Sequence, residues 1–167
     1  MGGVLTRHAG YDEDFFRWTR EQAEAIRAAA REGSNAPVDW DNVAEEIESL
    51  GKADRRACGS LINRILAHLA KLRLDSDSEA GRHWRSEISA FRGSLARILD
   101  DSPSLRARLS DFVAEEHPRA LRQLLAECED RPQLAGRVRA LMADPRAWFT
   151  AAEAADEDFL PEPLDTL

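Results

Sequence analysis

The chain has 167 residues, of which 32 % are charged and 43 % hydrophobic, and its formal net charge is −8. This length and composition fit one globular domain with a sizeable core. No apolar run reaches the ~18 residues of a membrane span, and residues 1–10 lack the apolar core of a signal peptide. The acidity argues against broad nucleic-acid binding, which needs a basic surface. We therefore expect a cytoplasmic protein that binds no membrane. Nucleic-acid binding through the basic helix expected at 79–99 is the less favoured alternative to a protein partner.

Charge is distributed unevenly along the chain. Residues 1–51 carry a net charge of −6, residues 52–99 a net charge of +5 and residues 100–167 a net charge of −7. A basic middle between acidic ends is expected to pair complementary faces, either inside one helical bundle or between two subunits. The alternative is a scatter of surface ion pairs, each worth only about 0–1 kcal/mol.

A first helix is expected to follow a flexible leader of ten residues. It should begin near Asp12, because residues 12–14 concentrate negative charge in a first turn. Gly33 and the loop residues up to Pro37 should end it. Its apolar stripe at helical spacing is formed by Phe15, Trp18, Ala25, Ile26 and Ala29.

The next segment, Val38 to Gly51, has the signals of a short helix. Asp41 and Asn42 are good N-cap residues, and Asn42 with Glu45 three positions later resembles a capping box. Gly51 suits the left-handed position that ends a helix. The apolar positions on one face are Val43, Ala44, Ile47 and Leu50.

Three carboxylates on this short helix allow two interpretations. Glu45 and Glu48 stand at i, i+3, a spacing found in solvated helix faces and also in helical carboxylate sites for metals or substrates. Glu46 lies at the edge of the apolar face, where a carboxylate most needs a specific partner.

A third helix is expected from about Ala53 to Leu74, with Cys58 as a buried, inert thiol. His68 lies at the edge of its wide apolar face, and Arg64 points to the same side. We interpret His68 as a hydrogen-bonded boundary residue, with a ligand or general base as the alternative. A turn at Gly51 would let Glu46 meet His68, with Arg64 or an arginine of the following helix completing a polar cluster.

Two longer helices and shorter pieces follow. The helix at 79–99 has the clearest pattern, with an apolar seam and a basic opposite face. The seam is Trp84, Ile88, Phe91, Leu95 and Ile98, and the basic face is Arg82, Arg85, Arg92 and Arg97. Ser102 and Pro103 should start a fifth helix, in which Pro118 should cause a kink or a break around Glu115 to His117. Pro132 and Pro145 should start two short helices.

These elements predict an all-α protein, an up-down helical bundle of four to five main helices plus short C-terminal helices. We expect a single domain over residues 11–150. Residues 151–167 should form an extended acidic, proline-containing tail.

Several segments together resemble a known family. They are YDEDFFRWTREQA from Tyr11, DWDNVAEEIESLG from Asp39, LAHLAKL from Leu66, WRSEI from Trp84 and DSPSLR from Asp101. In order and spacing they are similar to a bacterial family catalogued as domain of unknown function 29. Leu72 stands where relatives tend to carry an aromatic residue. The resemblance implies an all-helical bundle and a bacterial source, and it brings no established activity or catalytic residue.

The sequence lacks the common signatures of metal and cofactor chemistry. It has no pair of Glu-x-x-His motifs, no His-Glu-x-x-His, no Gly-rich phosphate loop and no Cys-x-x-Cys. We therefore predict no cofactor, no metal ligand and no catalytic residue. The enzyme alternative is a Mg²⁺- or Mn²⁺-dependent hydrolase of small phosphorylated substrates that uses helix-borne carboxylates. Its usual Glu-Glu-x-x-Glu register fails at Ser49, and Asp111 with Glu115 would have to supply the second acidic pair.

We favour a non-enzymatic role. The sequence predicts a binding or scaffolding module that self-associates as a homodimer or binds another protein, with its acidic and basic segments setting partner choice.

Overall fold

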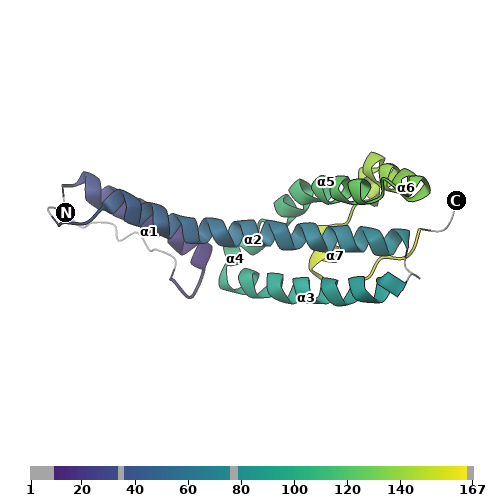
Figure 1. Cartoon of the computed structure of the whole chain (residues 1–167). Helices are drawn as coiled ribbons and strands as arrows, with labels where there is room; N and C mark the ends of the chain where they lie inside the picture. The colour runs from purple at the N-terminus through teal and green to yellow at the C-terminus, as the bar shows by residue number, and fades with distance from the viewer. Residues whose placement is uncertain (1–9, 34–35, 76–78, 165–167) are drawn as a thin grey trace. The chain divides into compact units, whose positions relative to one another are not determined.

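The computed structural model describes residues 10–33, 36–75 and 79–164, and within these ranges every regular element is helical (Figure 1). The elements are α1 (Phe15–Arg31), α2 (Trp40–Leu74), α3 (Glu79–Asp101), α4 (Pro103–Arg106), α5 (Leu109–Glu127), α6 (Pro132–Ala143), the 3-10 helix η1 (Pro145–Ala147) and α7 (Ala151–Ala155). The predicted all-α class is confirmed. No helix in these ranges combines the length and apolar character needed to cross a membrane.

Two compact units make up the chain. The first comprises Met1–Ala57 and Ile98–Ala107, and the second comprises Cys58–Arg97 and Arg108–Leu167. Helices α2 and α3 each contribute residues to both. The single domain expected over residues 11–150 stays a prediction, because a compact unit is not by itself an independently folding domain.

In the first unit, hydrogen bonds to Asp14 and Ser102 fix the start of α1. Asp14 is the N-cap, and its Oδ1 accepts from the Arg17 backbone N–H at 3.0 Å. The same carboxylate accepts from Ser104, at 2.8 Å from both its backbone nitrogen and its hydroxyl. Ser102 Oγ accepts from the Phe16 N–H at 3.1 Å. Helix α1 ends at Gly33, whose φ of 86° confirms the predicted stop.

The predicted helix end at Gly51 is wrong. Helix α2 runs without interruption from Trp40 to Leu74, and Gly51 is buried inside it. A Cβ at Gly51 would lie only 2.2 Å from Thr19 Oγ1 of α1, so the glycine serves close helix packing rather than termination. The start also differs from the prediction, because Asp39 receives the Asn42 backbone N–H at 3.3 Å and its side-chain amide at 2.6 Å.

The second unit holds a large apolar core. Its fully buried side chains include Ile62, Ile65, Leu66, Leu69 and Leu72 of α2, Ile88 and Leu95 of α3, Leu121 of α5 and Val138 of α6. This confirms the predicted interior of the third and fourth helices at these positions. Cys58 and Cys128 are both buried free thiols.

Of the kink or break predicted around Glu115 to His117, the break is wrong, because α5 continues through Pro118. An internal proline costs a helix about 3 kcal/mol. Burial of His117, Ala120, Leu121 and Leu124 around it offsets that cost and keeps the helix in place.

The C-terminal segment is fastened to the second unit. Thr150 and Glu153 form a capping box that starts α7, so helix replaces the extended chain expected from residue 151, and residues 156–164 have no regular secondary structure. Arg92 of α3, expected on the basic face, is 3 % exposed and donates to the carbonyls of Glu153, Ala154 and Phe159 at 2.7–3.0 Å.

Candidate functional site

The structure divides the predicted cluster of Glu46, His68 and Arg64. Glu46 is an exposed residue of α2 in the first unit, and His68 lies 22 positions later in the same helix, in the second unit. The turn at Gly51 that would have brought Glu46 against His68 does not exist, because the residue is helical. The predicted Glu46–His68 contact therefore loses its basis.

His68 is a hydrogen-bonded boundary residue, as predicted, with Glu87 of α3 as its partner. Its Nε2 lies 2.6 Å from Glu87 Oε2, and His83 Nε2 lies 3.3 Å from the same oxygen. The hydrogen bond with His68 lowers the pKa of Glu87 below its usual range. His68 and Arg64 share one further neighbour, the Phe91 ring, whose centroid is 5.7 Å from that of the His68 ring and 5.5 Å from the Arg64 guanidinium carbon.

The carboxylates considered for a metal site do not converge. Glu48 binds Arg27 at 2.7 Å and Lys52 at 3.2 Å, and the hydrogen bond from Arg27 lowers its pKa. Glu45 and Glu46 are exposed. In the described parts of the chain, no group of three or more His, Cys, Asp or Glu side chains is placed to hold a metal ion.

An uncovered apolar surface lies on the first unit. The side chains of α1 that are buried are Phe16, Thr19 and Ala23. The stripe predicted to face inward, represented by Phe15 and Trp18, is only half-buried. Helix α1 thus turns a narrow face of Phe16, Thr19 and Ala23 inward. Its broader apolar face, which includes Phe15 and Trp18, stays partly exposed.

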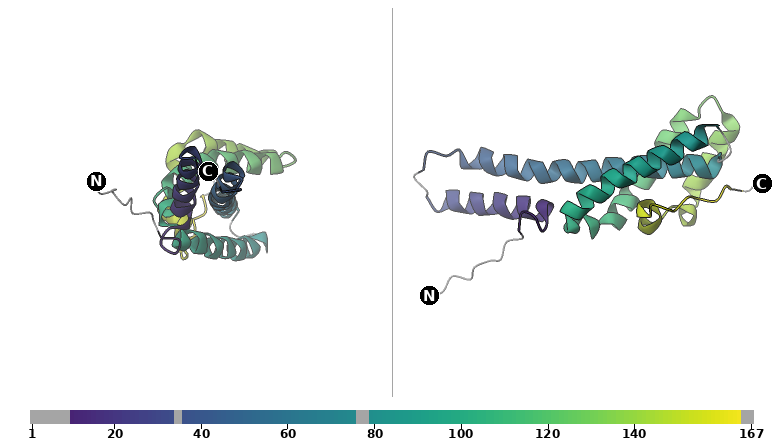
Figure 2. Two further views of the ribbon diagram at one scale, coloured as in Figure 1. Left: turned by 90° about the vertical axis from the view of Figure 1, so that its left-hand side faces the viewer. Right: turned by 90° about the horizontal axis from the view of Figure 1, so that it is seen from below.

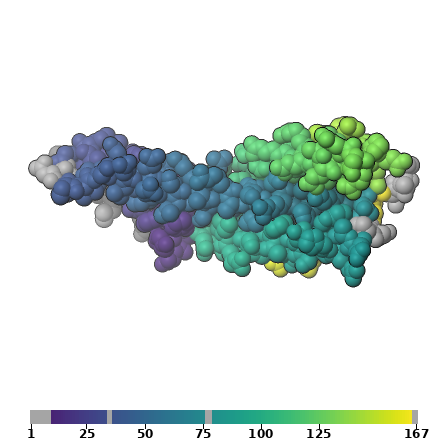
Figure 3. Space-filling view, in the orientation of Figure 1, coloured from purple at the N-terminus to yellow at the C-terminus, as the bar shows by residue number. Residues whose placement is uncertain are grey.

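Helix α2 extends this apolar surface. Thr19 faces Gly51, and Arg27 pairs with Glu48, so α1 and the first part of α2 run antiparallel and side by side (Figures 2 and 3). Trp18 and Leu50 each precede one of the facing residues by one position, a rotation of about 100°. In antiparallel helices equal rotations turn to the same side, so Trp18 and Leu50 share one face.

We call this surface the hairpin face. Its members are Phe15, Trp18, Ala25 and Ala29 of α1 and Val43, Ile47 and Leu50 of α2. Leu50 is 53 % exposed and Val43 39 %. Tyr11, 57 % exposed, adds an aromatic edge, with its ring 5.4 Å from that of Phe15 and 4.9 Å from that of Trp18 between centroids.

The apolar residues of this surface are visible in the sequence, but their helical spacing does not show which of them face α2. Phe15 and Trp18 lie on the predicted apolar stripe of the first helix because of their helical spacing. The contact with α2 is made instead by Thr19 and Gly51 together with the buried ring of Phe16, which a Cβ at Gly51 would meet at 3.3 Å.

The fold defines a class, namely an all-α protein in the residues that the structure describes. The chain belongs to the family described as "Domain of unknown function DUF29", whose model matches residues 11–160. It is similar to a solved structure, the 1.45 Å crystal structure of an alpha-helical protein of unknown function from Rhodospirillum rubrum. The identity is 23 %, the match covers 92 % of this chain and 93 % of that one, and the TM-score is 0.64. This likeness supports the fold alone. No curated protein matches the chain.

Proposed function

We propose that the protein is a binding and scaffolding module that self-associates through the hairpin face. The observation that carries this proposal is the exposure of Leu50 and Val43 beside the half-buried rings of Phe15 and Trp18. Contiguous apolar patches of this kind on soluble proteins mark interaction sites.

The size of the patch favours a reversible contact. The exposed parts of Tyr11, Val43 and Leu50, with the smaller exposed parts of Phe15 and Trp18, leave on the order of 500 Å² uncovered, about the size of the largest apolar patch on a typical monomer, which often serves an interaction. Two copies paired through it would bury about 1,000 Å², the low end for specific interfaces. The expected dimer therefore depends on protein concentration.

The distribution of side-chain size favours a second copy as the partner. Phe15, Trp18 and Leu50 make one end of the hairpin face bulky, whereas Ala25, Ala29 and the intermediate-sized Val43 make the other end smaller. A two-fold axis through the centre of the face would set the bulky end of each copy on the small end of the other. Such self-complementarity is what an isologous interface requires.

The alternative role, hydrolysis of small phosphorylated substrates with Mg²⁺ or Mn²⁺, has no comparable support. Glu48 is engaged by Arg27 and Lys52, and Glu45 and Glu46 face outward as separate exposed carboxylates.

Sedimentation velocity over a dilution series tests self-association. We expect the 18.7 kDa chain to shift toward twice that mass as its concentration rises. The double variant Val43→Lys, Leu50→Lys should remain monomeric, because two charges would be buried without partners in the interface. Leu160→Lys is the matched control, since Leu160 is 44 % exposed in the second unit, and it should dimerise like the natural chain. A natural chain that stays monomeric, or a double variant that dimerises equally well, contradicts the proposal.

A further inference from the structure

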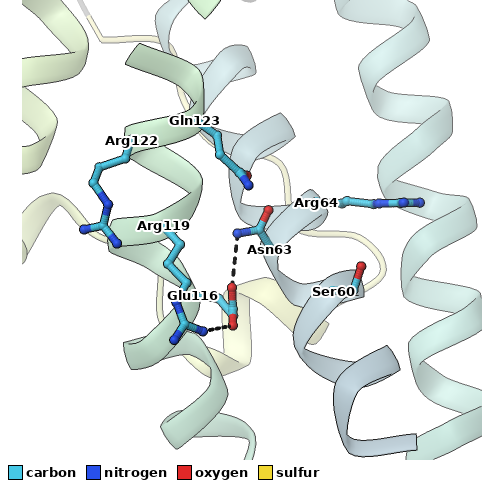
Figure 4. Close-up of a pocket in the computed structure, with 7 residues that line it drawn as sticks. All are labelled: Ser60, Asn63, Arg64, Glu116, Arg119, Arg122 and Gln123. Carbon is cyan, nitrogen blue, oxygen red and sulfur yellow. Dashed lines mark hydrogen bonds and ion pairs between the residues drawn. The ribbon is translucent and has the colours of Figure 1, made fainter. Parts of the chain in front are cut away.

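A polar groove lies in the second unit between α2 and α5 (Figure 4). It has a volume of about 640 Å³ and is lined by Ser60 and Asn63 of α2 and by Glu116, Arg119, Arg122 and Gln123 of α5. Binding sites for small molecules have volumes of roughly 300–1,000 Å³. The groove therefore has room for a small ligand.

The spacing of the α5 residues creates the charged wall of this groove. Glu116, Arg119 and Arg122 stand at i, i+3 and i+6, so Arg119 is a neighbour of both, and Glu116 and Arg122 lie about 120° apart around α5. Arg64 of α2 borders the groove, but Figure 4 shows its side chain pointing away from α5, where it lies over the Phe91 ring. Figure 4 also shows the Arg122 side chain on the side of α5 away from α2, so Arg119 is the cationic group nearest the groove and Arg122 lies at its outer edge.

Glu116 is fully engaged. Its Oε2 accepts from Asn63 Nδ2 at 3.1 Å, and its Oε1 accepts from Arg119 Nη1 (Figure 4). The Glu116 side chain is 13 % exposed, while that of Arg119 is 54 % exposed. The carboxylate therefore anchors one edge of the Arg119 guanidinium and leaves its other donors toward solvent.

The groove consequently has a surplus of hydrogen-bond donors. Arg122 is exposed and makes no ion pair or hydrogen bond with the described part of the chain. A guanidinium has five N–H donors, and Gln123 and Ser60 add further ones. The only carboxylate in the lining is already paired. A ligand that satisfies this surface must bring acceptors and negative charge.

We propose that the groove binds a compact, multiply charged anion bearing phosphate or carboxylate groups. Arg119 and Arg122 supply charge-assisted hydrogen bonds from adjacent turns, and Asn63, Gln123 and Ser60 orient the ligand. None of the described residues that line the groove is aromatic, so the groove recognises the charged group and offers no stacking surface for a base. This site belongs to the second unit and is independent of the hairpin face.

Isothermal titration calorimetry at low salt with pyrophosphate and, separately, with citrate tests this site and distinguishes the two anion chemistries. We expect saturable one-to-one binding of at least one of them, weakened by added salt. Arg122→Gln should reduce affinity about tenfold through loss of charge-assisted hydrogen bonds. Glu116→Gln should increase affinity several-fold, because it removes the competing carboxylate and frees the donors of Arg119 while keeping an acceptor for Asn63.

The opposite signs of these two effects separate a binding site from general surface charge. Arg82→Gln is the matched control, since Arg82 is an exposed arginine of α3 outside the groove, and it should bind as the natural chain does. Thermal unfolding of each variant verifies that the fold is kept. The proposal is overturned if neither anion binds, or if Arg122→Gln and Glu116→Gln leave the affinity unchanged.

Discussion

The two units achieve stability in different ways. In the first unit, a helical hairpin is held by small contacts, namely the Thr19–Gly51 approach and the hydrogen bonds of Asp14 and Ser102, and it leaves a broad apolar face outside. In the second unit, the apolar core is closed, and polar side chains are drawn into it. Arg92 and His117 are each only 3 % exposed.

This difference separates two uses of apolar surface. In a unit with a closed apolar core, a buried polar side chain can hold a chain segment in one position through hydrogen bonds. Arg92 does this for residues 153–159. A unit that leaves a face uncovered has surface available for a partner. Buried polar side chains occur in both units, Asp14, Thr19 and Ser102 in the first and Arg92 and His117 in the second. Of the two charged ones, Asp14 and Arg92, Arg92 is the more deeply buried and is expected to matter most for stability.

The largest effect is expected at Arg92. Arg92→Met keeps much of the side-chain volume but removes the donors of the carbonyls of Glu153, Ala154 and Phe159. Leaving three carbonyl acceptors, one buried and two part-buried, without charge-assisted hydrogen bonds should lower the free energy of unfolding by about 3–5 kcal/mol. Urea denaturation measures this. Arg82→Met, at an exposed position of the same helix, should change it by less than about 0.5 kcal/mol, and equal losses would refute the role given to Arg92.

A somewhat smaller effect is expected from acid at His117. Burial, followed by the charge of Arg73, lowers the pKa of His117 from 6.5 to about 4. The neutral ring fits its surroundings, because Nε2 accepts from the Phe149 N–H at 3.1 Å and the ring stacks on Trp148 at 4.6 Å. A protonated Nε2 could not accept that bond.

Proton uptake by the unfolded chain determines whether the free energy of unfolding rises or falls with pH. As pH falls below 6.5 the unfolded chain binds a proton that folded His117 does not, so the free energy of unfolding decreases until about pH 4. The full loss is about 3 kcal/mol. Chemical denaturation at pH 7, 5.5 and 4 should show this loss in the natural chain and a flatter dependence in His117→Gln. Parallel curves for the two proteins would contradict it.

Local patterns predicted much of the fold. The end of α1 at Gly33 and the burial of Ile88 and Leu95 in α3 depend on spacing and on one backbone conformation, and both were predicted correctly. The break at Pro118 was not, because whether a helix continues through proline depends on what packs around it, here the burial of His117 and Leu121.

The candidate sites were less predictable, since they depend on which helix faces which. The boundary positions of His68 and Arg64 could be found from helical spacing, but their common neighbours Glu87 and Phe91 on α3 could not. The i, i+3 spacing of Glu116, Arg119 and Arg122 can be seen in the sequence. That these residues line a groove could not be predicted, because the groove's other side includes Asn63, which lies 53 positions before Glu116.

Gly51 shows most directly how a distant residue decides a local structure, and it provides the smallest of these effects. Alanine is a better helix former than glycine by about 1 kcal/mol, so Gly51→Ala would stabilise an isolated helix. In the protein its Cβ would lie 2.2 Å from Thr19 Oγ1, and Thr19 is fully buried with its hydroxyl donating to the Phe16 carbonyl at 2.8 Å. Overpacking of this kind costs about 1–3 kcal/mol, and we expect a net loss of about 1–2 kcal/mol in urea denaturation.

A double-mutant cycle tests whether the Thr19 hydroxyl causes the loss of stability expected for Gly51→Ala. Thr19→Ala removes the hydroxyl that a Cβ at residue 51 would meet, so Gly51→Ala should cost much less, or stabilise, when Thr19→Ala is already present. If Gly51→Ala costs the same with and without Thr19→Ala, the close approach does not explain the glycine. If it stabilises the natural chain outright, the hairpin can open enough to admit a methyl group. The small-residue contact would then not be what directs Phe15 and Trp18 to the outside of the first unit.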